Sequence, residues 1–213
     1  IIYHSFQDWV LMVILAGLIY VLFEYYIKPL FFKRLFVSVF NQSVTNKLVS
    51  EHNALTNRIN HSLNFVFYVN LSLALFLVVQ YYNIKMPVEH TFMQALILFL
   101  AVVIVFHFRL LVYHLVGWIT GHFDIQLQYT SHWMIMNKLY GILLIPGLLL
   151  MLYLPYNQKE VLIVACLVIY SFVFVVKIFR GIQISIQNIL SLFSIILYLC
   201  ALEIMPVGIL INS

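Results

Sequence analysis

The fold is decided by residues 91–117, TFMQALILFLAVVIVFHFRLLVYHLVG, an apolar run whose only strongly charged residue is Arg109. Roughly 20 helical residues cross a bilayer core about 30 Å thick, so this run is long enough to span it. Five further apolar stretches accompany it, at residues 9–27, 63–84, 139–154, 161–179 and 189–211. We therefore predict an all-α fold: a polytopic transmembrane helical bundle of about six spans, forming a single membrane domain over residues 1–213.

The composition supports the same class of protein. The chain is 64% hydrophobic and 8% charged, whereas soluble domains contain roughly a quarter charged residues. A net charge of +4 would suggest nucleic acid as the partner of a soluble chain. In a membrane protein, contact with anionic headgroups accounts for such a charge. We expect the lipid bilayer as a partner and no nucleic acid.

The basic residues lie mostly on one side of the predicted bundle. If all six stretches span, one side holds only Lys85 and Lys159, and the other holds nine Lys and Arg residues: Lys28, Lys33, Arg34, Lys47, Arg58, Arg109, Lys138, Lys177 and Arg180. Basic loops mark the cytoplasmic face. Both termini are therefore expected on the opposite, periplasmic side.

Two cytoplasmic segments are predicted to lie along the membrane surface. Residues 30–48 place apolar side chains at near-helical spacing among basic ones, which predicts an in-plane amphipathic helix after the first span. The alternative is a first span that continues past the membrane. Residues 121–137 are polar and include Trp133, which we expect at headgroup depth.

Ionisable residues within the spans are the first candidates for a functional site, because placing them in lipid is unfavourable. They are Glu203, Arg109, His107 and His114. If the third span ends near Phe108, Arg109 extends to the inner surface; if it continues, Arg109 is deep. On a helix, His107 and His114 share one face, and Arg109 points about 160° away.

Polar stripes mark two further helices. Residues leading into and within the second stretch share a face, namely Asn53, Asn57, His61, Asn64, Tyr68 and Ser72. A second stripe, which leads into the sixth stretch, lies opposite Glu203, namely Gln187, Ser191, Ser194 and Tyr198. Polar groups in a bilayer need partners, so such faces should point inward or at another membrane subunit. Asn137 precedes the fourth stretch, in which Pro146 should produce a kink.

No catalytic motif was found, and no catalytic residue is assigned. The rings of His107 and His114 would lie about 10 Å apart along one helix, so one haem iron cannot bind both. We expect no metal and no cofactor; haem remains an alternative that needs two haems or a ligand from a partner.

Residues 197–206, LYLCALEIMP, resemble the closing signature of a family of uncharacterised integral membrane proteins from Bacteroidota. That signature is a Tyr-Leu-Cys…Leu-Glu-Ile-Leu-Pro run, in which Met205 here replaces a Leu. Similar elements elsewhere are Asn137, Gly141 and Pro146, and the run Phe179-Arg180-Gly181. The resemblance covers about residues 90–213 and implies location in a bacterial inner membrane, not an activity. It directs attention to Tyr198, Cys200, Glu203 and Pro206.

Three functions follow as hypotheses. The first is a non-enzymatic inner-membrane subunit or scaffold of an envelope-biogenesis or secretion assembly, with other membrane proteins as partners. The second is a small proton-coupled transporter that uses Glu203. The third is a haem- or quinone-binding redox subunit that uses His107 and His114.

Overall fold

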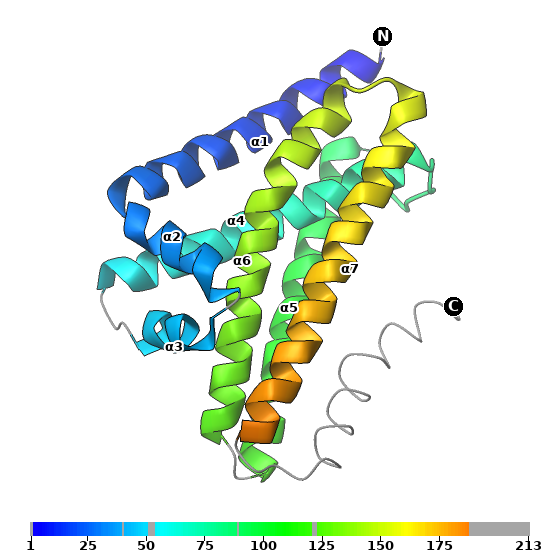
Figure 1. Ribbon diagram of the computed structural model, residues 1–213. Helices are drawn as coiled ribbons and strands as arrows, with labels where there is room; N and C mark the ends of the chain where they lie inside the picture. The colour runs from blue at the N-terminus through cyan, green and yellow to red at the C-terminus, as the bar shows by residue number, and fades with distance from the viewer. Residues whose placement is uncertain (1, 40, 51–53, 89, 121–122, 188–213) are drawn as a thin grey trace.

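The computed structural model describes residues 2–39, 41–50, 54–88, 90–120 and 123–187, and these form helices and short connections (Figure 1). The helices are α1 (Ile2–Ile27), α2 (Pro29–Ser38), α3 (Gln42–Ser50), α4 (Ala54–Tyr81), α5 (Thr91–Thr120), α6 (Phe123–Tyr153) and α7 (Tyr156–Gln187). The predicted all-α class is confirmed.

Five of these helices are long and apolar enough to cross a membrane. Their candidate spans are Asp8–Ile27, Arg58–Tyr81, Thr91–Leu115, Thr130–Tyr153 and Gln158–Phe179. They correspond to the first five predicted stretches. The sixth stretch, residues 189–211, lies outside the residues that the structure describes.

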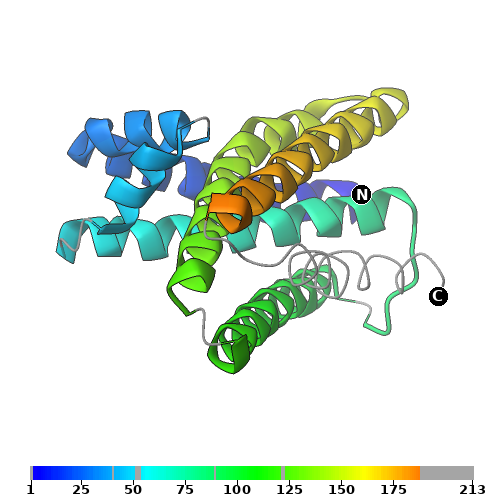
Figure 2. The same ribbon diagram turned by 60° about the horizontal axis from the view of Figure 1, so that its bottom comes forward.

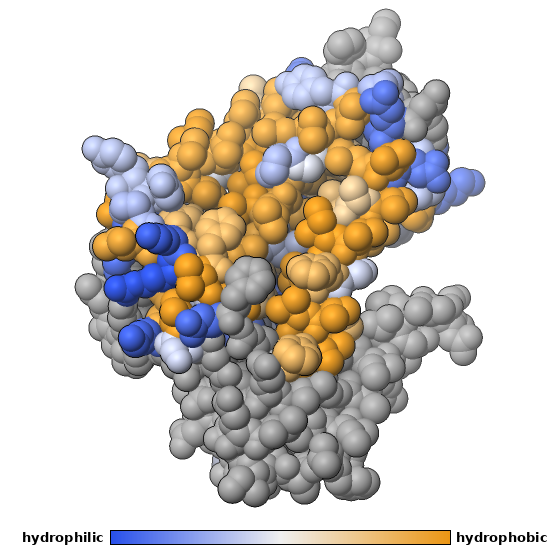
Figure 3. All heavy atoms as spheres, in the orientation of Figure 1, coloured by the Kyte–Doolittle hydropathy of each residue, from blue (hydrophilic) through white to orange (hydrophobic). Residues whose placement is uncertain are grey.

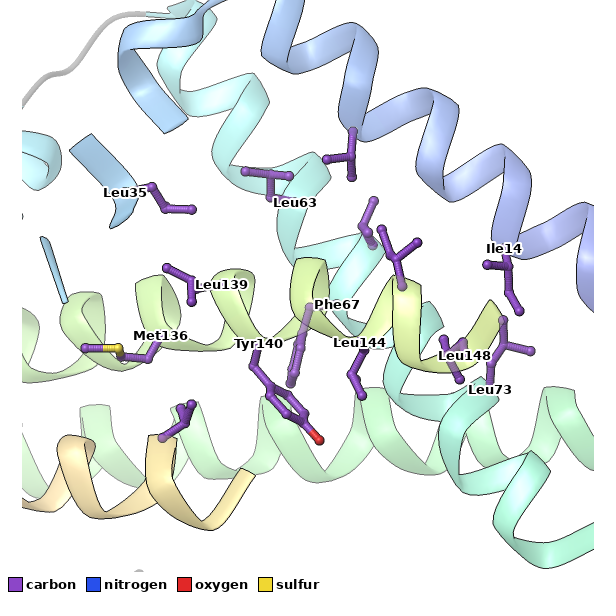
Figure 4. Close-up of a cluster of buried hydrophobic side chains, with 14 of the residues drawn as sticks. Ile14, Leu35, Leu63, Phe67, Leu73, Met136, Leu139, Tyr140, Leu144 and Leu148 are labelled. Carbon is purple, nitrogen blue, oxygen red and sulfur yellow. The ribbon is translucent and has the colours of Figure 1, made fainter. Parts of the chain in front are cut away.

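Helix α6 is the central element. It packs against α1, α4, α5 and α7, and 67% of its span is buried, against 6% of the α5 span. Both ribbon views show α4 crossing α6 while α7 runs alongside it (Figures 1 and 2). A core of Phe67, Tyr140, Leu144 and their neighbours fills the crossing of α4 and α6 (Figure 4).

A glycine sets how closely α4 and α6 approach each other. A Cβ atom on Gly141 would lie 2.7 Å from the Cα of Phe67, so only glycine fits here without a shift. Beside it, the Asn70 side-chain amide donates to the carbonyl oxygen of Gly141 at 2.9 Å. Small residues that permit close backbone approach, together with interhelical hydrogen bonds, are typical of helix contacts in membranes.

Within the expected surface segment 121–137, residues 123–137 instead form the first half of α6. The fourth span is therefore longer than the predicted stretch 139–154. The reason is that the polar residues before Leu139 face neighbouring helices: His132, Trp133, Asn137 and Lys138 are all buried. The side chain of Trp133 is 3% exposed and packs within the bundle. Its expected position at headgroup depth stays a prediction.

The predicted amphipathic helix at residues 30–48 is divided into α2 and α3. Pro29 starts α2, and Asn41 caps α3 by accepting a hydrogen bond from the Ser43 amide at 3.0 Å. The Thr45 hydroxyl donates to the carbonyl of Ser38 at 3.1 Å, which satisfies the end of α2.

The two short helices bury their apolar faces within the bundle. Both α2 and α3 pack against α6, and their buried apolar side chains are Phe31, Phe32, Leu35 and Leu48. The surface has an apolar band, with hydrophilic residues near α2 and α3 and near the turn between α6 and α7 (Figure 3). Such a band is typical of a protein that crosses a bilayer.

Candidate functional site

One face of α6 carries a buried aromatic ring that contacts two cations. The guanidinium carbon of Arg109, on α5, lies 4.6 Å from the ring centroid of Trp133. The Nζ atom of Lys177, on α7, lies 5.1 Å from the same centroid. Cations at this distance are attracted by the negative face of an indole ring. Trp133 therefore joins α5, α6 and α7.

Hydrogen bonds fix both cations in this cluster. Lys177 Nζ donates to Asn137 Oδ1 at 2.5 Å, and both partners are buried. Arg109 Nε and Nη2 donate to the Tyr113 hydroxyl oxygen at 3.0 and 2.8 Å. The structure thus brings two of the predicted site residues to the same cluster. Arg109 contacts Trp133 directly, and Asn137 accepts a hydrogen bond from Lys177.

The path of α5 clarifies the position of Arg109. The helix continues to Thr120, well past Phe108, so Arg109 lies in its interior. Its side chain is directed at α6, where it meets Trp133, and Tyr113 beside it is fully buried. Arg109 therefore takes part in helix packing.

The two histidines of α5 lie on the exposed side of this helix. The side chains of His107 and His114 are both exposed, and each Nδ1 lies 2.8 Å from the backbone carbonyl oxygen four residues earlier. The His107 ring also contacts that of Tyr68, with centroids 5.9 Å apart. The separation of both histidines from Arg109, predicted from helical phase, is consistent with these contacts.

The opposite face of α6 borders a cavity of about 210 Å³. The helices α2, α3, α4 and α6 enclose it, and its lining is Phe31, Leu35, Leu48, Asn60, His61, Asn64, Ser131, Met134, Ile135 and Lys138. Lys138 is 5% exposed and donates to Asn60 Oδ1 at 2.9 Å. Asn64 of α4, a predicted site residue, lines this cavity and is not part of the cluster around Trp133.

The sequence interpretation did not identify Lys138 as a site residue, because it assigned that lysine to a cytoplasmic loop. A signal was present: Ser131, Ile135 and Lys138 share one helical face if the segment is read as a helix. That face turned out to line the cavity.

Glu24 was also missed, although it lies in the predicted first span. Its side chain is 3% exposed. Its Oε1 accepts hydrogen bonds from the Tyr20 hydroxyl at 2.9 Å and from the Ser62 hydroxyl at 3.4 Å. A carboxylate buried against hydroxyl groups links α1 to α4. In the sequence, Tyr20 lies one helical turn before Glu24, and this spacing indicates that the two side chains can form a hydrogen bond.

Glu203 and Tyr198 lie outside the described residues. Because a carboxylate is unfavourable in lipid, we expect Glu203 to face protein, bonded to Arg109 or to polar groups such as Asn64, Asn70 or Tyr68. This expectation stays a prediction. Among the residues that the structure does describe, no group of three or more His, Cys, Asp or Glu side chains is arranged to hold a metal ion.

A family model described as a domain of unknown function, DUF4271, matches residues 10–213, which is nearly the whole chain. No curated protein and no solved structure matches the chain. The expected membership of an uncharacterised family is confirmed by this match.

Proposed function

We propose that this chain, which belongs to the DUF4271 family, is a non-enzymatic subunit of a larger assembly in the inner membrane of a member of the Bacteroidota. Its role would be to hold partner proteins in an envelope-biogenesis or secretion complex. The basic residues in and around α2 and α3, namely Lys28, Lys33, Arg34 and Lys47, favour a topology in which these helices are cytoplasmic and both termini are periplasmic.

The observation that carries this proposal is the exposed face of α5 that contains His107, Leu111 and His114. His107 and His114 are exposed within a candidate span, on a helix of which only 6% is buried. Leu111 lies between them on the same face and is 54% exposed. Two imidazoles on an otherwise apolar surface are unfavourable toward lipid.

A partner helix packed against this face would remove both imidazoles from contact with lipid. Leu111 and its apolar neighbours would supply close packing around the two histidines. The inward cluster around Trp133 would keep α5 in position, because Arg109 joins it to α6.

Site-specific photo-crosslinking in native membranes tests the proposal. A photoreactive residue at position 111 should form a stoichiometric adduct with a membrane protein, identified by mass spectrometry. The matched control is position 167 on α7, because Leu167 is 59% exposed and Leu111 is 54% exposed. We expect the adduct at position 111 and not at position 167.

The histidines are tested in the same assay. The double variant His107→Leu/His114→Leu should lose the adduct, whereas Ser171→Leu, an exposed polar residue on α7, should retain it. Purification of a monomer without adducts at native expression level would contradict the proposal. So would an adduct that both variants form equally well.

A further inference from the structure

The cavity between α2, α3, α4 and α6 has the features of a small ligand site. Of its two basic lining residues, Lys138 is 5% exposed and His61 is exposed. The lining therefore contains a buried ammonium group and an imidazole that solvent can reach. From these residues we infer that the cavity binds a phosphate anion, carried by the headgroup of an anionic phospholipid.

The polar lining is rich in hydrogen-bond donors. Lys138 uses one N–H for Asn60 Oδ1, at 2.9 Å, and an ammonium group has three. Asn64 and Ser131 make no side-chain hydrogen bond in the part of the chain that the structure describes. The lining contains Lys138 and His61 but neither Asp nor Glu. A cationic group among neutral donors matches the acceptor oxygens of a phosphate.

The apolar lining and the volume indicate which part of a lipid fits. Phe31, Leu35 and Leu48, from α2 and α3, form the apolar wall. At about 210 Å³ the cavity is smaller than the roughly 300–1,000 Å³ of pockets for drug-sized ligands. It can accept a headgroup with the adjoining glycerol, while the acyl chains stay in the bilayer.

The surrounding sequence favours an anionic lipid. The segment 28–47 includes α2 and most of α3. It contains four Lys or Arg residues and no Asp or Glu. Basic segments at the cytoplasmic surface attract anionic lipids, and basic pockets between helices on this side bind their headgroups. The inference is independent of the proposed partner surface, because that surface lies on α5.

Native mass spectrometry of the purified full chain tests this inference. The protein is titrated in detergent with phosphatidylglycerol, with phosphatidylcholine, or with inorganic phosphate, and the fraction of protein carrying one bound molecule is measured. We expect saturable binding of one phosphatidylglycerol. Phosphatidylcholine should bind at least tenfold more weakly, because its quaternary ammonium cancels the headgroup charge and would enter a lining that contains Lys138 but neither Asp nor Glu. Lys138→Met should weaken phosphatidylglycerol binding at least tenfold.

Two further variants make the result decisive. Lys85→Met removes an exposed cation from the connection between α4 and α5 that neither lines the cavity nor belongs to residues 28–47, so the affinity of this variant should equal that of the wild type. Asn64→Leu narrows the cavity without breaking a hydrogen bond of the described chain, and it should also weaken binding. If Lys138→Met does not fold, binding by Asn64→Leu tests the inference in its place.

The other outcomes are equally informative. Binding of inorganic phosphate that Lys138→Met abolishes would support the phosphate site and identify soluble phosphate as its source. Equal binding of phosphatidylglycerol by the wild type, Asn64→Leu and Lys85→Met, with Lys138→Met also equal where it folds, would overturn the inference. Absence of any saturable binding to the wild type would overturn it too.

Discussion

Replacing Gly141 by alanine tests the closest contact in the bundle. The added Cβ would lie 2.7 Å from the Cα and 2.8 Å from the Cβ of Phe67. Carbon atoms in favourable contact are about 3.5–4.0 Å apart, so α4 and α6 must separate by roughly 1 Å. The backbone of α4 cannot turn aside as a flexible side chain could. The variant should therefore disturb the whole crossing.

The magnitude follows from three contributions. Overpacking of this kind costs about 1–3 kcal/mol. The hydrogen bond from Asn70 to the Gly141 carbonyl, 2.9 Å long, would be stretched beyond bonding distance, at a further cost of about 0.6 kcal/mol. Alanine gains about 0.5–1 kcal/mol over glycine within a helix. The net loss in the free energy of unfolding should be about 1–3 kcal/mol.

Two other glycines provide internal controls. A Cβ on Gly147 would lie 3.2 Å from the Cys166 sulfur, and one on Gly17 would lie 3.9 Å from Asn70 Oδ1, an ordinary contact. The three alanine variants are compared by unfolding with SDS in mixed micelles, followed by intrinsic tryptophan fluorescence. We expect destabilisation to increase in the order Gly17, Gly147, Gly141.

A different order would refute this reasoning. In particular, Gly141→Ala that unfolds at the same SDS fraction as Gly17→Ala would mean that α4 and α6 do not approach as closely as the structure shows.

Four further predictions concern polar and aromatic side chains. Asn70→Ala should lower the free energy of unfolding in SDS by about 0.6–1.7 kcal/mol, the range for interhelical hydrogen bonds; no change would mean that the bond to α6 is weak. Trp133→Leu should lower the melting temperature more than Trp118→Leu. Trp133 contacts two cations, and each contact contributes about 0.5–2 kcal/mol, whereas Trp118 is 79% exposed. Glu203→Leu should reduce the yield of folded protein if its carboxylate faces protein, as the sequence predicts, and an unchanged yield would count against that orientation. The absorption spectrum of the purified chain should lack a Soret band; such a band, lost in His107→Leu, would favour the haem hypothesis.

The sequence by itself determined the fold class and most of the helices. Runs of apolar residues long enough to cross a bilayer are a property of the local chain, and no long-range contact is needed to recognise them. Helical phase correctly separated His107 and His114 from Arg109, because the direction of a side chain around a helix depends only on spacing. The sequence also named Asn137 as a candidate site residue, although it did not predict the residues that contact it.

The tertiary structure decided which polar residues meet. Asn137 and Lys138 are adjacent in sequence, yet Asn137 accepts from Lys177, 40 residues away, and Lys138 donates to Asn60, 78 residues away. Hydropathy could not assign these partners, and it made residues 121–137 look like a surface segment because their polar character resembles that of a loop. The burial of Trp133 and Asn137 in this segment depends on groups supplied by α5 and α7. In a bilayer, helix pairing is set by packing and interhelical hydrogen bonds between distant segments, which a hydropathy pattern along one chain does not contain.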